Sequence, residues 1–182
     1  MNLYQKFKEE LENLGGNVYS IQSIDEAVRF IKKLIAENGI KKVALARLEK
    51  KIENLLYDGL KDSVEVIRAL ELKENFKEVL DKVDLGITDC DLALANTGTI
   101  ILSCRNELER LVTALPTIHL VIFNKDKIVK DLEDTLEFFS RILEEYPLSI
   151  TFISGPSKTA DILGQLVKGA HGPRKVLALV LD

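Results

Sequence analysis

Helical and strand-like segments alternate along most of this chain, and this alternation constrains the fold more than any other feature. Ser23 to Glu26 has the pattern of a helix start, and Asn38-Gly39 predicts where that helix ends. Apolar strands are predicted over residues 40–46, 63–67, 119–123, 149–153 and 176–181. Helices are predicted over residues 48–56, 74–83, 106–114, 132–143 and 159–167. Since parallel strands are joined by helical crossovers, we expect an α/β fold with a mainly parallel sheet flanked by helices.

One turn signal interrupts this alternation. Residues 91–95 and 99–103 are strand-like, and Asn96-Thr97-Gly98 between them predicts a hairpin or tight corner. Gly98 is expected where a side chain would be poorly tolerated. The sequence has no internal repeat, low-complexity segment or interdomain linker, so we expect residues 1–182 to form one domain.

Composition argues against several classes of protein. The formal net charge is −4, with lysines interleaved among acidic residues, which gives no electrostatic footprint for nucleic acid. No apolar run approaches the ~20 residues of a membrane span, and the N-terminus does not resemble a signal peptide. These features predict a soluble, cytoplasmic protein.

The chain has two cysteines, Cys90 and Cys104, which are too few for an iron–sulfur cluster or a four-cysteine zinc site. A disulfide between them is the alternative, but thiols stay reduced in the cytoplasm. We therefore expect both cysteines to be structural, and we expect no bound metal or cofactor.

The strongest signal for a binding site is the segment Ser154-Gly155-Pro156-Ser157-Lys158-Thr159-Ala160-Asp161. It directly follows an apolar strand, and ligands of open α/β sheets bind beyond the carboxyl ends of strands. The glycine would allow close approach to a ligand, and the predicted helix start would present free amides to a carboxylate or phosphate. The alternative is that Ser157 or Thr159 only caps that helix.

Two further segments carry polar groups. Asn96-Thr97-Gly98-Thr99 places hydroxyls at a strand end, although the motif is weak and the pattern favours a plain turn. In Ala170-His171-Gly172-Pro173-Arg174, the histidine is either a general base or a brace for the turn. We predict that this turn and the 154–161 loop meet at one end of the sheet, near Thr97 and Thr99. His119, within an apolar strand, is expected in the core. Asp89, Asp91 and Asp161 offer carboxylates, but the sequence does not bring them together.

Taken together, these segments resemble the LUD domain, a family named for lactate utilisation. The resemblance rests on residues 91–100, 110–119, 153–162 and 169–174, and it is specific over residues 84–182. It implies a sheet fold similar to ribose-5-phosphate isomerase, glucosamine-6-phosphate deaminase and the CoA transferases. It also implies a role in oxidising L-lactate to pyruvate beside iron–sulfur partner subunits.

The chain departs from the family's pattern at two positions. It has Asn96 and Leu163 where the family often has glutamate, so a carboxylate able to act as base or nucleophile is missing at both. The leading expectation is a cluster-free subunit or accessory of a lactate-oxidising system, with His171 as its acid–base residue. The residues expected to bind its small anionic ligand are Thr97, Gly98, Thr99, Ser154, Gly155, Ser157, Lys158, Thr159, Asp161 and Arg174.

Two other functions stay open, because a fold does not determine a function. One is a free-standing enzyme that acts on a phosphosugar or an acyl-CoA, which would turn over substrate alone. The other is a regulatory or assembly module, which would have a partner and no small ligand.

Overall fold

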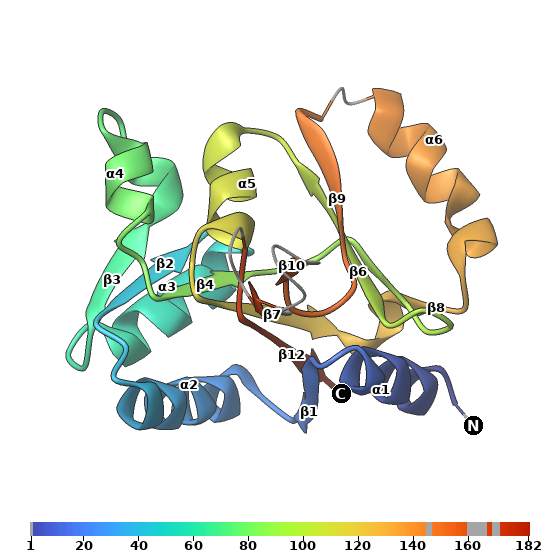
Figure 1. Ribbon diagram of the computed structural model, residues 1–182, viewed down its shortest axis with the longest axis horizontal. Coiled ribbons are helices and arrows are strands. Elements are labelled where there is room, and N and C mark those ends of the chain that lie inside the picture. Colours follow the sequence, from blue (N-terminus) through green and yellow to red (C-terminus); the bar gives the residue numbers. More distant parts are fainter. Residues whose placement is uncertain (1, 145–146, 160–166, 169–171) are drawn as a thin grey trace.

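A six-stranded parallel sheet forms the centre of the computed structural model, which describes residues 2–144, 147–159, 167–168 and 172–182 (Figure 1). The strand order is β1-β12-β7-β4-β2-β3, and every pairing is parallel. The strands are β1 (Asn17–Ile21), β2 (Lys42–Leu45), β3 (Glu65–Arg68), β4 (Leu85–Thr88), β7 (Ile118–Asn124) and β12 (Lys175–Leu181). The predicted α/β fold with a mainly parallel sheet is confirmed.

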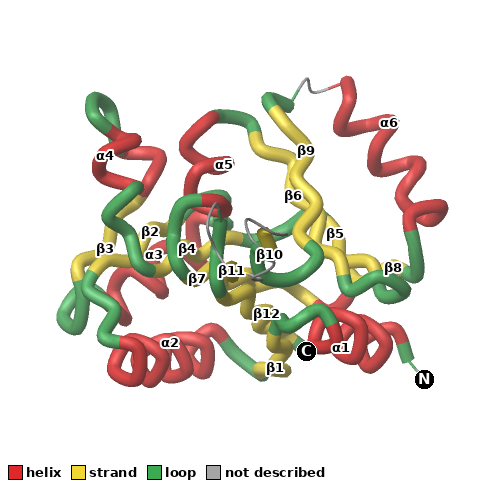
Figure 2. Tube along the Cα trace, in the orientation of Figure 1, coloured by secondary structure: helices red, strands yellow, loops and turns green. Residues whose placement is uncertain are grey.

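Helices cover both faces of this sheet (Figure 2). Side chains of β7 show the two layers, because Ile118 and Leu120 pack in one core with α2 and α3, whereas Val121 and Phe123 pack in another core with α1. Strands buried on both faces read as continuous apolar runs, which explains why these strands were recognisable. The helices are α1 (Leu3–Asn13), α2 (Ile24–Asn38), α3 (Lys50–Leu60), α4 (Phe76–Leu80) and α5 (Glu107–Ala114). No helix among the described residues is long and apolar enough to cross a membrane.

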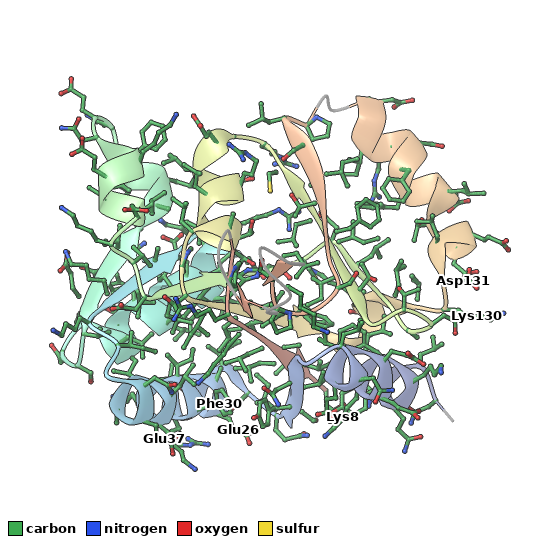
Figure 3. The ribbon with its side chains drawn as sticks, viewed as in Figure 1. Lys8, Glu26, Phe30, Glu37, Lys130 and Asp131 are labelled. Carbon is green, nitrogen blue, oxygen red and sulfur yellow. The ribbon has the colours of Figure 1, made fainter. Side chains whose placement is uncertain are left out.

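The predicted helix start at Ser23 is present in α2. The Ser23 hydroxyl accepts a hydrogen bond from the Glu26 amide at 3.2 Å, and Gly39 ends the helix with φ 63°. The Glu26 carboxylate accepts from the amide of Gln22, the residue before the capping serine. Glu26 and Glu37 mark the two ends of this helix in Figure 3. In contrast, α1 and β1 were not predicted from the sequence.

A second, mixed sheet with the strand order β8-β5-β6-β9 lies beside the first. Its strands are β5 (Leu92–Leu94), β6 (Thr99–Cys104), β8 (Ile128–Val129) and β9 (Ser149–Ile153). β5 and β6 form the predicted hairpin, and Gly98 in its turn has φ 59°. β9 also pairs antiparallel with β6, so it does not belong to the parallel sheet that the alternation predicted. The sequence did not reveal this pairing because β7 and a helical arm separate the two strands.

The predicted helix over residues 159–167 is wrong at both of its ends. Lys158–Thr159 form β10, which pairs antiparallel with β11, formed by Val167–Lys168; residues 160–166 lie outside the described part. A helix of this length would hold its ends about 13 Å apart, whereas paired strands lie about 5 Å apart. Threonine and valine, the residue types at positions 159 and 167, have a high preference for strands.

The predicted late helix is a separate arm made of a 3-10 turn, Leu132–Thr135, and α6, Leu136–Glu144. Asp131 caps this arm, and the Asn96 side-chain amide donates to the Asp131 carboxylate at 3.2 Å. Figure 3 labels Asp131 and its neighbour Lys130 at the base of the arm. Asn96 therefore ties the hairpin turn to the start of the arm.

His119 is a core residue, as expected from its apolar strand. It is fully buried, and its Nε2 lies 2.9 Å from the hydroxyl oxygen of Thr88. Its Nδ1 has no hydrogen-bond partner among the described residues. Burial lowers the pKa of His119 from 6.5 to about 4, because the charged imidazolium is poorly solvated there.

This pKa predicts a pH-dependent stability. Since the folded pKa lies below the unfolded one, the unfolded chain binds a proton more readily as the pH falls below 6.5. The free energy of unfolding should therefore decrease between pH 6.5 and about 4, with roughly 3 kcal/mol attributable to His119. Urea unfolding of His119→Gln should show a smaller loss over this range than the unmodified protein. An identical pH dependence of the two proteins would contradict the assignment to His119.

Candidate functional site

The two segments singled out by the sequence meet in their described parts. The Ser157 amide donates to the carbonyl of Pro173 at 2.9 Å, and a Cβ at Gly172 would lie 3.1 Å from Ser157 Cβ. A cavity of about 220 Å³ lies between them, lined by Thr113, Ala114, Thr151, Phe152, Ile153, Ser154, Gly155, Ser157, Gly172, Pro173 and Val176. Asp161, Leu163 and His171, which the sequence also singled out, lie outside the described residues.

Three hydroxyl groups gather beside this cavity. β6 begins where β9 ends, with Ile100 paired to Ile153, so Thr99 and Ser154 are neighbours. The Thr99 hydroxyl lies 2.8 Å from the Ser154 hydroxyl and accepts from the Thr97 hydroxyl at 2.8 Å. Of the three, only Ser154 lines the cavity itself.

Other features expected of this site are not found in the described residues. Lys158 and Arg174 are exposed and do not line the cavity. The Ser157 amide is bonded to Pro173, and Ser157 leads into β10, so it neither caps a helix nor offers a helix-start amide. Because β9 belongs to the mixed sheet, the rule for carboxyl ends of parallel strands does not apply to the loop that follows it.

The two glycines of the expected site face α1. A Cβ at Gly98 would lie 2.3 Å from the backbone nitrogen of Leu11, and one at Gly155 would lie 3.0 Å from the carbonyl oxygen of Leu14. Both glycines have positive φ, 59° and 92°. Packing against α1 accounts for both of them without a ligand.

A second, charged site lies at the carboxyl ends of β2, β4 and β7. β2 and β4 are neighbours in the sheet, but the chain continues from β2 to β3 on one side of this pair and from β4 to β7 on the other side. Open α/β sheets bind ligands at such a switch point. A cavity of about 400 Å³ opens there, which we call the switch-point crevice. Its lining residues are Arg47, Leu48, Glu49, Leu70, Asp89, Cys90, Asp91, Arg105, Glu109 and Lys127.

An ion pair between Arg47 and Asp91 forms one wall of the switch-point crevice, and each side chain is only 16% exposed. The Asp91 carboxylate also accepts from the Ser103 amide at 2.6 Å and from its hydroxyl at 2.8 Å. Arg47 Nε donates to the Ser103 carbonyl at 2.9 Å. Arg47 has φ 56°, a strained conformation for a residue with a side chain, and such strain concentrates at functional sites.

A second ion pair lies beside the first. Lys127 Nζ donates to both carboxylate oxygens of Asp89, at 2.8 and 2.7 Å, and to the Cys90 carbonyl at 2.7 Å. The switch-point crevice was missed from the sequence because Arg47 and Lys127 belong to no motif. The available signal was the position of Asp89 directly after a buried strand, with Asp91 two residues later.

Cys90 and Cys104 are free and buried. Burial raises the pKa of both thiols, which disfavours the thiolate needed for metal binding or nucleophilic attack. Within the described residues, no three His, Cys, Asp or Glu side chains are grouped so that they could hold a metal ion.

The purified protein is therefore expected to be colourless and to carry no stoichiometric iron or zinc. Elemental analysis and an absorption spectrum test this expectation. About one metal ion per chain, lost in a Cys90→Ser Cys104→Ser variant, would contradict it.

The LUD domain matches residues 4–181, and the chain belongs to this family. Lactate utilization protein C of Halalkalibacterium halodurans is 37% identical over 112 residues, which are 60% of this chain and 49% of that protein. The protein of the same name from Shouchella clausii is 37% identical over 107 residues, which are 58% of this chain and 47% of that protein. The chain thus spans about half the length of these curated relatives.

The fold is similar to a crystal structure of a DUF162 family protein from Deinococcus radiodurans. The TM-score is 0.71 at 20% identity, over 99% of this chain and 96% of that chain. The predicted membership of the LUD domain family is confirmed, and the match extends well before residue 84. The similarity to isomerases, deaminases and CoA transferases stays a prediction.

Proposed function

We propose that this protein is a cluster-free subunit or accessory of a cytoplasmic lactate-utilising system, working beside iron–sulfur partner subunits. Its relatives named lactate utilization protein C support this role. We further propose that it binds a small anionic ligand in the cavity between residues 154–157 and 172–173. At about 220 Å³, this cavity lies below the ~300–1,000 Å³ of typical drug-sized pockets, which suits a molecule the size of lactate.

The main support for an anionic ligand is the hydroxyl of Ser157. It belongs to a residue that lines the cavity, and it has no hydrogen-bond partner among the described residues. A hydroxyl in this position donates naturally to a carboxylate. Ser154 supplies a second hydroxyl, which Thr99 orients and Thr97 supports in turn.

The remaining residues of the expected site have assigned roles in this proposal. Lys158 and Arg174 supply positive charge near the cavity, and His171 exchanges a proton with the ligand's hydroxyl. His171 immediately precedes Gly172, which lines the cavity. Thr159 and Asp161 belong to the segment that continues from the same loop.

Calorimetric titration with L-lactate and pyruvate tests the proposal. Ser157→Ala should weaken binding about tenfold, because it removes a hydrogen bond to a charged group, while leaving the melting temperature nearly unchanged. Ser140→Ala, which alters an exposed serine of α6, is the matched control and should bind normally. Binding unchanged in Ser157→Ala would show that this residue is structural. Oxidation of lactate should also require the partner subunits, and turnover by the purified chain alone would favour a free-standing enzyme.

A further inference from the structure

The switch-point crevice continues beneath α6. A second cavity of about 540 Å³ is lined by Asp91, Leu92, Lys127, Val129, Asp134, Glu137, Phe138 and Arg141. Asp91 and Lys127 line both cavities, so the two compartments meet at these side chains. Each compartment alone falls within the ~300–1,000 Å³ of small-molecule sites, and together they far exceed what lactate would fill. We propose that this two-part crevice binds a nucleoside phosphate.

The two carboxylates of the switch-point crevice, Asp91 at the junction of the compartments and Asp89 beside it, can accept hydrogen bonds from the two hydroxyls of a ribose. A carboxylate has about four acceptor positions. Asp91 accepts from Arg47, the Ser103 amide and the Ser103 hydroxyl, and Asp89 accepts twice from Lys127 and once from the Cys90 amide. Each carboxylate therefore keeps about one acceptor position for a hydroxyl donor. Acidic side chains bind ribose hydroxyls in the same way in other nucleotide-binding parallel sheets.

Arg47 is the residue proposed to bind the phosphate of the ligand. Its Nε donates to the Ser103 carbonyl, and its Nη2 donates to Asp91 and to the Ser103 hydroxyl. Nη1 makes no hydrogen bond within the described residues, so its two hydrogens can be donated to phosphate oxygens. Asp91 and Ser103 hold the guanidinium in place, which reduces the entropy lost on binding. Of the two other acids lining this compartment, Glu49 is exposed, and Glu109 accepts from the Arg105 amide at 2.8 Å.

Phe138 is the residue proposed to stack on the base of the ligand. It lines the α6 compartment together with the apolar side chains Leu92 and Val129. Its ring contacts Phe139 nearly edge-on, with centroids 5.4 Å apart. Stacking of a base on an aromatic ring stabilises nucleotide binding, and Phe138, Leu92 and Val129 give this compartment the apolar wall that such stacking needs. Arg141 also lines this compartment.

Calorimetric titration of the full chain with AMP, adenosine and ribose 5-phosphate tests the proposal. AMP should bind. Adenosine, which lacks the phosphate, and ribose 5-phosphate, which lacks the base, should each bind at least tenfold more weakly than AMP. Phe138→Ala should weaken AMP and adenosine but not ribose 5-phosphate. Arg47→Lys keeps a cation beside Asp91 but loses the two free hydrogens, so it should weaken AMP and ribose 5-phosphate but not adenosine.

Two control variants lie outside the crevice. Tyr19→Ala removes a partly exposed aromatic ring on β1, and Arg29→Met removes an exposed cation on α2; both should bind AMP normally. Ser157→Ala should also bind AMP normally, which separates this site from the proposed lactate site. No binding of AMP at millimolar concentration, or AMP affinity unchanged in both Phe138→Ala and Arg47→Lys, would overturn the proposal. Phe138 is not fully buried, so loss of the fold in Phe138→Ala is not expected.

Discussion

Gly98→Ala is expected to lower the free energy of unfolding by roughly 3–5 kcal/mol. The added Cβ would lie 2.3 Å from the backbone nitrogen of Leu11 and 2.6 Å from the carbonyl carbon of Glu10. Because these are backbone atoms of α1, no side-chain rotation relieves the clash, and the whole helix has to move. The residue would also adopt φ 59°, which is strained for alanine. Urea unfolding with linear extrapolation measures the change.

Gly39→Ala is a matched control for this prediction. Gly39 has nearly the same φ, 63°, but nothing lies within 4 Å of its added Cβ. It should therefore show only the cost of the left-handed conformation, about 1 kcal/mol. If the two variants lose the same stability, then α1 does not pack against the hairpin turn as described.

Asp91→Ala should have the second large effect, a loss of about 2–4 kcal/mol in the free energy of unfolding. The substitution leaves the Arg47 guanidinium, only 16% exposed, without its counterion. It also leaves the amide and hydroxyl of Ser103 without their acceptor. A charged or polar group that is shielded from water and has lost its partner destabilises the folded state. This destabilisation is much larger than the stabilisation that the intact ion pair or hydrogen bond provides.

Two comparisons check the cause of that loss. Asp58→Ala removes a carboxylate from an exposed pair with Lys61 and should change stability very little. The double variant Arg47→Met Asp91→Ala removes both charges and should recover part of the stability lost in Asp91→Ala. A double variant that is less stable than Asp91→Ala would show that Arg47 contributes through other contacts.

The sequence alone determined the elements whose signals are local. The apolar runs of β7 and β12 are continuous because both faces are buried, and the capping serine and terminal glycine of α2 act within a few residues. The hairpin at Gly98 was predictable for the same reason, since two strands separated by a short turn pair with each other. Membership of the LUD domain family followed from short motifs in fixed order.

The tertiary structure alone decided which distant segments became neighbours. β9 pairs with β6, and strands replace the predicted helix at both 158–159 and 167–168, because long-range pairing outweighed the local pattern. The segment 154–157 therefore meets the turn at 172–174, although no helix begins there.

The switch-point crevice depended even more on the tertiary structure. Arg47, Asp91 and Lys127 follow three different strands, β2, β4 and β7, and of the three only Asp91 lies in a segment that the sequence singled out. The order of those strands is set by which apolar faces are buried together, and parallel pairing then places their carboxyl ends at one edge. Hydrophobic burial, which does not depend on these charged residues, is what brings them to one crevice.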